Sequence, residues 1–120
     1  MNTAFSQYKQ QNIMNLTKGE QLILLYDEII KELNLSKFYI SNNDFCQCNE
    51  TFHRAHKINN YLISILNNDY EISENLLQLY MFCRRQITTA NTLKDIKMVD
   101  EVLAIYVELR DAFQQAQKSK

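Results

Sequence analysis

Side chains that bind metals gather in one short stretch of the chain. Cys46, Cys48, His53 and His56 carry the thiol and imidazole groups that Zn²⁺ prefers. A C-x-C pair followed by H-x-x-H at this spacing is not a standard zinc pattern. The cysteines fit a loop and the histidines a helix, so the four groups need not converge. We therefore predict no metal site and no cofactor, with a metal held by these four residues as the minor alternative.

The same stretch contains one E-x-x-H unit, Glu50 to His53. Di-metal carboxylate bundles need two such units and two further inward carboxylates. The chain has no histidine besides His53 and His56, so a second unit is absent. A glycine-rich phosphate loop is also excluded, because the chain has a single glycine. No Ser/His/Asp set stands out, and we predict that the protein is not an enzyme.

The overall charge argues against a nucleic-acid partner. The 120 residues include 13 basic and 14 acidic side chains, for a net charge of -1, whereas nucleic-acid binders usually carry a basic excess. No apolar run approaches the ~20 residues that span a bilayer. The N-terminus lacks the basic start and apolar stretch of a signal peptide. Three cysteines in such a chain indicate reduced thiols, and we expect a cytoplasmic protein.

Helical periodicity dominates the chain, which has no proline and one glycine. The predicted helices cover residues 17–41, about 44 or 49 to 66, about 70–90, and about 92 or 95 to 117. Thr17 and Glu20 form a capping box at the first helix. Links this short force neighbouring helices to run antiparallel. The predicted fold is all-α, an antiparallel up-down four-helix bundle over residues 17–117. A short N-terminal arm or helix (1–16) precedes it, and a frayed C-terminus (118–120) follows.

Each predicted helix carries one apolar stripe for the core. The stripes are Leu22, Leu25, Tyr26, Ile29, Leu33 and Ile40; Phe52, Ala55, Ile58, Leu62 and Ile65; Ile72, Leu76, Leu79, Tyr80, Cys83, Ile87 and Ala90; and Val99, Val102, Leu103, Tyr106, Leu109 and Phe113. Further apolar residues lie beside them: Ile23, Ile30, Tyr61, Ile63, Leu77, Met81, Phe82, Ile105 and Val107. This surplus fits a generously packed core, a homodimer face, or a groove for a partner helix.

The stretch Ala55-His56-Lys57-Ile58 resembles the phosphate-accepting segment of histidine phosphotransfer domains, which are also four-helix bundles. Their pattern is H-x-x-K-G, in which Lys and Gly support the phosphorylated His. The corresponding residues after His56 are Asn59 and Asn60, so both supports are missing. Phosphotransfer through His56 is the alternative function.

A second resemblance covers nearly the whole chain. The segment Gln21-Leu22-Ile23-Leu24-Leu25-Tyr26-Asp27 resembles the opening motif Q-L-I-x-M-L-Y-D-G of the flagellar export chaperone FliS family. Later motifs agree in order and spacing: Ala55, Ile58, Leu62, Leu66 and Asn67; Asn75-Leu76, Leu79-Tyr80 and Ala90-Asn91; and Glu101-Val102-Leu103 with Glu108 to Phe113. Two positions depart from the family pattern, since Glu28 replaces its Gly and Phe113 its Trp.

This resemblance implies a chaperone that binds the disordered C-terminal segment of flagellin, prevents premature polymerisation and assists flagellar type III export. The bound segment would become helical in hydrophobic grooves. Other flagellar export or regulatory proteins, and a homodimer, are further possible partners. Tyr8 lies where the family has an N-terminal Tyr, and the resemblance implies that the arm, with Phe5 and Tyr8, contributes to partner contacts. The predicted partner-binding set is therefore Phe5 and Tyr8 on the arm and Leu22, Tyr26, Asp27, Asn91 and Arg110 at motif positions. For Asp27, we expect either an ion pair with Arg110 or hydrogen bonds from backbone N–H groups of the arm.

Overall fold

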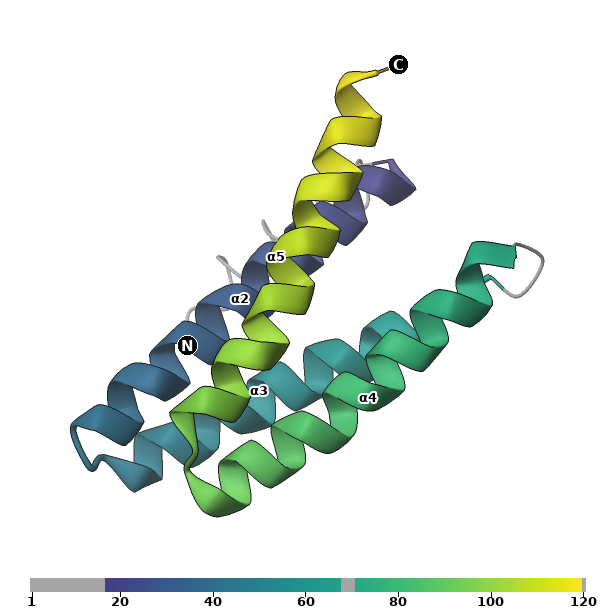
Figure 1. Ribbon diagram of the computed structural model, residues 1–120. Helices are drawn as coiled ribbons and strands as arrows, with labels where there is room; N and C mark the ends of the chain where they lie inside the picture. The colour runs from purple at the N-terminus through teal and green to yellow at the C-terminus, as the bar shows by residue number, and fades with distance from the viewer. Residues whose placement is uncertain (1–16, 68–70, 120) are drawn as a thin grey trace, which may run out of the picture.

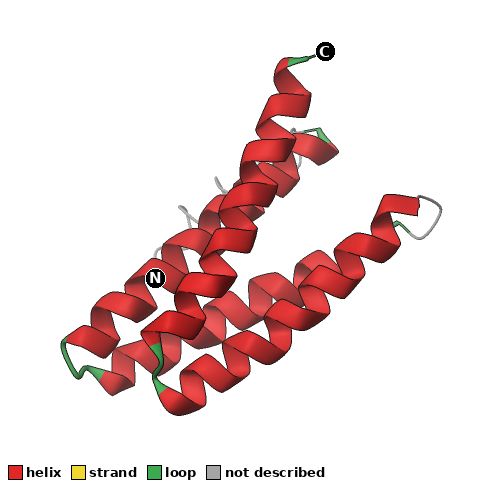
Figure 2. Cartoon of the chain, in the orientation of Figure 1, coloured by secondary structure: helices red, strands yellow, loops and turns green. Residues whose placement is uncertain are grey.

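The computed structural model describes residues 17–67 and 71–119, and no strand is present in these ranges. The four helices are α2 (Lys18–Ser41), α3 (Phe45–Ser64), α4 (Glu71–Leu93) and α5 (Ile96–Lys118). The short connections in Figure 2 force each helix to run antiparallel to the next. The predicted all-α four-helix bundle is confirmed. The predicted arm, residues 1–16, lies outside the described residues.

Helix starts follow the expected capping chemistry. The Thr17 hydroxyl accepts a hydrogen bond from the backbone N–H of Glu20 at 3.2 Å. Asp44 caps α3 by accepting from the backbone N–H of Gln47 at 3.3 Å, and Asp95 caps α5 by accepting from that of Lys97 at 2.9 Å. Of the two starts considered for each of the second and fourth helices, those next to Asp44 and Asp95 are therefore the ones adopted.

Two helix ends lie beyond their predicted positions. α4 continues to Leu93, about one turn past the predicted end at Ala90, and α5 ends at Lys118 rather than at residue 117. The apolar stripe of α4 stops at Ala90, so the sequence pattern could not show the extra turn. α4 ends where Lys94 adopts a left-handed backbone conformation with φ 51°.

The helices form two pairs that diverge toward one end of the molecule. α2 lies beside α5, and α3 lies beside α4 (Figure 1). The pairs meet where the α2–α3 and α4–α5 turns lie, at the lower left of Figure 1, and separate toward the upper right. We call the upper right the open end. It contains the start of α2, the end of α3, the start of α4 and the end of α5.

Divergence explains where the predicted core stripes fail. Residues near the turns are buried, among them Ile29, Leu33, Phe52, Ala55, Ile87, Val99 and Val102. The predictions were wrong at Ile65, Ile72 and Leu79, which are 40%, 60% and 37% exposed. All three lie at or toward the open end, where the opposite helices no longer approach closely enough to cover them.

Candidate partner-binding surfaces

Leu22, Tyr26 and Asp27, from the predicted opening motif, have three different environments. Tyr26 is fully buried in the core, while Leu22 is partly buried and packs against that core. Asp27 is exposed and pairs with Arg110 of α5, with 3.3 Å between Oδ1 and the guanidinium nitrogen. The expected Asp27–Arg110 ion pair is thus present, and its hydrogen bond raises the pKa of Arg110. The pair ties α2 to α5 at the surface.

Tyr26 belongs to a buried hydroxyl network that joins all four helices. Its hydroxyl lies 2.5 Å from that of Tyr80, which connects α2 to α4 across the bundle. The Tyr106 hydroxyl donates to the side-chain oxygen of Asn59, which connects α5 to α3 along the other diagonal. The Asn59 amide in turn donates to the backbone oxygen of Tyr80 at 2.9 Å. We call these four side chains the tyrosine brace; each is fully buried.

Exposed apolar side chains occupy the side of α4 that faces α5, from the open end to just past the level of this brace. Ile72, Leu79 and Phe82 of α4 share one side of that helix and are 60%, 37% and 39% exposed. Gln86, on the same side, bonds to Glu101 of α5 at 2.6 Å, so this side of α4 faces α5.

The Gln86–Glu101 contact also fixes the antiparallel register of the two helices. Phe82 comes level with Ile105, and Leu79 comes level with Glu108, the residue before Leu109. Ile105 and Leu109 are both partly buried against the core. We call the surface formed by these five residues, Ile72, Leu79, Phe82, Ile105 and Leu109, the α4–α5 groove.

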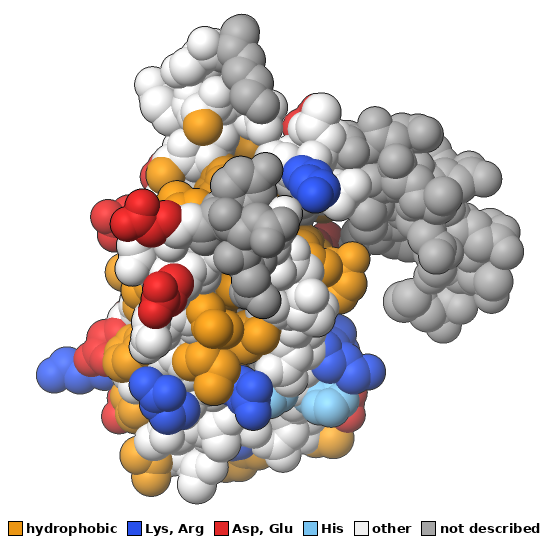
Figure 3. Space-filling view, turned by 90° about the vertical axis from the view of Figure 1, so that its right-hand side faces the viewer, with side chains coloured by type: hydrophobic (Ala, Val, Ile, Leu, Met, Phe, Trp, Pro, Cys, Tyr) orange, Lys and Arg blue, Asp and Glu red, His pale blue; other side chains and the backbone are white. Residues whose placement is uncertain are grey.

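Figure 3 shows the side of the molecule on which α4 lies. A hydrophobic patch occupies the middle of this face, and Lys and Arg side chains lie below it. Phe82 was recognised as surplus in the sequence. Ile72 and Leu79 were missed as surface residues because their spacing matches a core stripe; only the divergence of the helices exposes them.

A smaller apolar surface lies between α2 and α3 at the open end. The Arg54 guanidinium binds the Glu32 carboxylate at 2.7 Å and sets the register of these two helices. Two turns toward the open end, Tyr61 and Leu25 come level. Tyr61 is 52% exposed, and Leu25 is partly buried.

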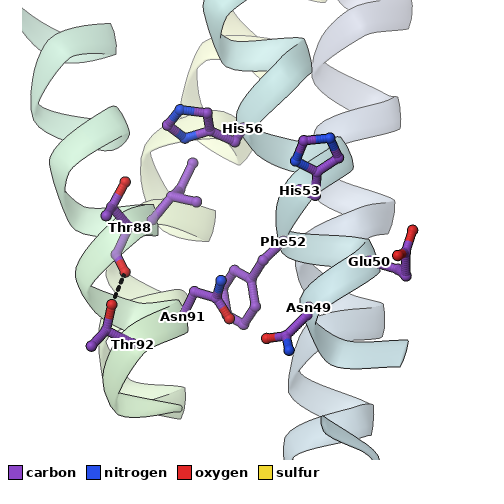
Figure 4. A pocket seen from close by; sticks show the side chains of 9 residues that line it. Asn49, Glu50, Phe52, His53, His56, Thr88, Asn91 and Thr92 are labelled. Atoms are coloured by element: carbon purple, nitrogen blue, oxygen red, sulfur yellow. Dashed lines mark hydrogen bonds between the residues drawn. The ribbon is translucent and has the colours of Figure 1, made fainter. Parts of the chain in front are cut away.

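A mixed polar and apolar pocket of about 570 Å³ lies between α3 and α4, near the turns. Its apolar lining is Phe52 and Ile87, and its polar lining includes His53, His56, Asn91 and Thr88. Figure 4 shows the two histidines projecting from α3 and the threonine and asparagine from α4, with the Phe52 ring between the helices. Asn91 of the predicted set therefore lines a pocket, while Phe5 and Tyr8 lie outside the described residues.

The cysteines and histidines of the metal hypothesis are not gathered. Cys48 is buried, and its thiol points back to α2, where it donates to the Ser36 backbone oxygen at 3.7 Å. Cys46 is exposed, and the histidines line the pocket. Within residues 17–67 and 71–119, no group of three or more His, Cys, Asp or Glu is arranged to hold a metal ion.

His56, the candidate phosphate acceptor, is partly buried in the pocket. Burial lowers its pKa, and the positive charges of Arg84 and His53 lower it further. No observation on the described residues favours phosphotransfer through His56. In the described part of the chain, none of the helices is both long and apolar enough to cross a membrane.

Comparisons with known proteins agree on one family. The family model described as flagellar protein FliS matches residues 1–120. The flagellar secretion chaperone FliS of Bacillus subtilis (strain 168) is 30% identical over 116 residues, which are 97% of this chain and 87% of that protein. A crystal structure of a flagellar chaperone from bacteria superposes with a TM-score of 0.83 at 22% identity. The match covers 98% of this chain and 97% of that one, and it shows a shared fold.

Proposed function

The chain belongs to the FliS family of flagellar secretion chaperones, and from this premise we propose that it binds the disordered C-terminal segment of flagellin in the cytoplasm. Binding would hold flagellin back from premature polymerisation and present it for flagellar type III export. No cofactor or nucleotide is part of this proposal, because association alone protects the segment.

The observation that carries the proposal is the α4–α5 groove. Its α4 side chains extend from residue 72 to residue 82, or about 15 Å of helix. That length matches a partner helix of about three turns, with apolar side chains spaced i, i+3 or i+4, and i+7. The partly buried Ile105 and Leu109 provide the second wall. A partner helix bound between these walls would bury the apolar side chains that the divergence of the helices leaves exposed.

The energetics favour coupled folding and binding. A disordered segment loses conformational entropy when it becomes helical. Each Å² of apolar surface that leaves water returns about 25 cal/mol. The groove residues are already ordered on helices, so the chaperone itself loses little entropy.

The predicted partner-binding residues take distinct roles in this proposal. Leu22, like Leu25, supplies apolar surface at the open end, and Tyr26 acts from the core by holding the groove helices in place. Asp27 and Arg110 supply polar contacts at the rim. Phe5 and Tyr8 are proposed to contact the partner from the N-terminal arm.

Calorimetric titration with a peptide from the C-terminal region of the same cell's flagellin tests the proposal. We expect saturable one-to-one binding, with helicity by circular dichroism above the sum of the two components. Leu79→Gln should weaken binding about ten-fold, because it places an amide in the groove. Leu93→Gln is the matched control, since Leu93 is 63% exposed at the other end of the same helix.

Two results would count against this assignment. Equal affinity of the Leu79 and Leu93 variants would remove the α4–α5 groove as the binding surface. If a soluble, competent peptide did not bind, the chain would share the family's fold but flagellin would not be its ligand. Homodimerisation and binding of other flagellar proteins through the same groove are separate predictions, which sedimentation and competition with the flagellin peptide would test.

A further inference from the structure

Lys94 has a backbone conformation that lysine rarely adopts. Its φ of 51° lies in the left-handed region, where helices usually end on glycine or asparagine. The position follows Leu93 directly and ends α4. Glycine would be unstrained at this position, so contacts of the Lys94 side chain must offset the strain.

Among residues 17–67 and 71–119, the hydrogen-bond acceptors of the Lys94 ammonium group are all uncharged oxygens. It donates to Asn49 Oδ1 at 2.5 Å, to Asn91 Oδ1 at 2.5 Å and to the Asn91 backbone oxygen at 2.8 Å. It also lies 5.7 Å from the centre of the Phe52 ring. Among the described residues no carboxylate forms an ion pair with it. A full positive charge is thereby fixed beside the pocket between α3 and α4.

This contact determines the orientation of the Asn91 side chain. An ammonium group can only donate, so the amide oxygen must face Lys94 and the amide nitrogen must face away. Figure 4 shows the Asn91 nitrogen on the side of the histidines. Within the described structure, that nitrogen donates to no protein acceptor. The nearby ammonium polarises the amide and makes its N–H groups stronger donors.

The charges around the pocket favour an anion. His53 and His56 offer ring N–H groups, and Arg84 lies close enough to His56 to lower its pKa. The single acidic lining residue, Glu50, projects away from the other side chains in Figure 4 and lies 4.0 Å from Arg54.

We propose that this pocket is a second binding site, which takes a carboxylate side chain from an acidic segment of a partner protein. The carboxylate would accept hydrogen bonds from the Asn91 amide and from the histidine rings. Its methylene groups would lie on Phe52 and Ile87. A pocket of about 570 Å³ is larger than one carboxylate requires and has room for the neighbouring residues of a peptide.

The site is independent of the α4–α5 groove. Thr88 and Asn91 line the pocket from the side of α4 that faces α3, whereas Leu79 and Phe82 lie on the side that faces α5. A segment bound here leaves the groove free. If the flagellin peptide does not bind in the α4–α5 groove, the pocket can still bind an acidic segment, and the reverse also holds.

Titration of the full chain with a short glutamate-rich peptide, followed by NMR, tests the proposal. We expect saturable shifts of the Asn91 side-chain amide and the His56 ring, and none with the glutamine counterpart of the peptide. Asn91→Asp should weaken binding at least about ten-fold, because it keeps an oxygen for Lys94 but replaces the N–H donors with negative charge. Asn34→Asp is the control, because it adds the same charge at an exposed position of α2. This variant should bind the peptide as tightly as the unaltered chain does.

Lys94→Gly provides a second variant that suits the left-handed backbone and should also weaken binding. Three outcomes would overturn the proposal: equal binding by the Asn91 and Asn34 variants, shifts that spread over the surface without saturating, or no binding at all. Inorganic phosphate is a further arm of the titration. Saturable phosphate binding at Asn91 without peptide binding would assign the pocket to a free anion and exclude the partner segment.

Discussion

Tyr26 matches the family motif but lies in the core rather than on a partner-binding surface. The opening motif places it among the predicted partner-binding residues, yet its side chain is fully buried and its hydroxyl lies against that of Tyr80. The sequence could show that the residue matches the motif and lies on the apolar stripe. It could not show the Tyr80 contact, because the two tyrosines come from helices that are adjacent neither in the sequence nor in the bundle.

Tyr26→Phe should lower the free energy of unfolding by about 1–3 kcal/mol. The substitution leaves the Tyr80 hydroxyl without its partner in a dry core while hardly changing the packed volume. Urea denaturation followed by circular dichroism measures the difference. Tyr39→Phe, on the same helix but only partly buried, is the control and should change the value little. Equal effects of the two substitutions would argue against the brace.

The Asp27–Arg110 pair should contribute little to stability. The side chains are 47% and 27% exposed, and exposed pairs contribute at most about 1 kcal/mol because water screens them. Arg110→Gln should therefore shift the free energy of unfolding by no more than that amount, and the shift should shrink in high salt. If the same variant lost flagellin binding at full stability, Arg110 would be assigned to the interface rather than to the fold.

At the scale of elements, α4 shows what periodicity can and cannot predict. A strong 3.6-residue pattern predicts the helix. The predicted burial of its inner face is confirmed at Leu76, Tyr80, Cys83, Ile87 and Ala90. Ile72 and Leu79 match the same pattern but are exposed, because burial also depends on where the opposite helix runs. The angle between helix pairs comes from the packing of all four stripes together, and no single segment encodes it.

The α5 cap offers a test at this scale. The Asp95 carboxylate accepts hydrogen bonds from the backbone N–H groups of Lys97 and Met98 at 2.9 and 3.4 Å. Asp95→Ala should cost about 1 kcal/mol, because two N–H groups at the helix start lose their acceptor. Asp95→Asn should recover most of the loss in thermal denaturation. No difference between the alanine and asparagine variants would contradict the capping role.

For the whole molecule, burial of acidic hydroxyl and thiol groups predicts sensitivity to alkali. Burial raises the pKa of Cys83 from 9.0 to about 11 and raises the pKa values of Tyr26 and Tyr106 as well. The unfolded chain therefore releases these protons first, so stability is complete below pH 9 and falls as the pH rises toward 11. Cys83 alone should account for about 2–3 kcal/mol of this loss.

Denaturant titrations at pH 8 and pH 10.5 check the alkaline prediction. Cys83→Ala should reduce the difference between the two pH values, although it leaves a small cavity that lowers stability at both. Cys46→Ala, at an exposed position, should leave the difference unchanged. A difference that does not depend on Cys83 would assign the alkaline loss to the tyrosines alone.

The N-terminal arm gives a second prediction at this scale. If residues 1–16 cover apolar surface before a partner binds, deletion of residues 1–14 should increase binding of a hydrophobic dye to a still-folded bundle. Competition of the dye with the flagellin peptide would then place both on the same surface. Unchanged fluorescence in the folded truncation would contradict a covering role.

The tyrosine brace has a consequence for the timescales on which parts of the backbone open. It joins both diagonals of the bundle, so the turns and the open end on either side of it need not fluctuate together. Amides near the turns, such as those of Leu33 and Val102, should exchange with deuterium only when the whole chain unfolds. Amides near Ile72 and Leu109 should exchange through smaller local openings. Removing the Tyr26 hydroxyl should bring the two exchange rates closer together.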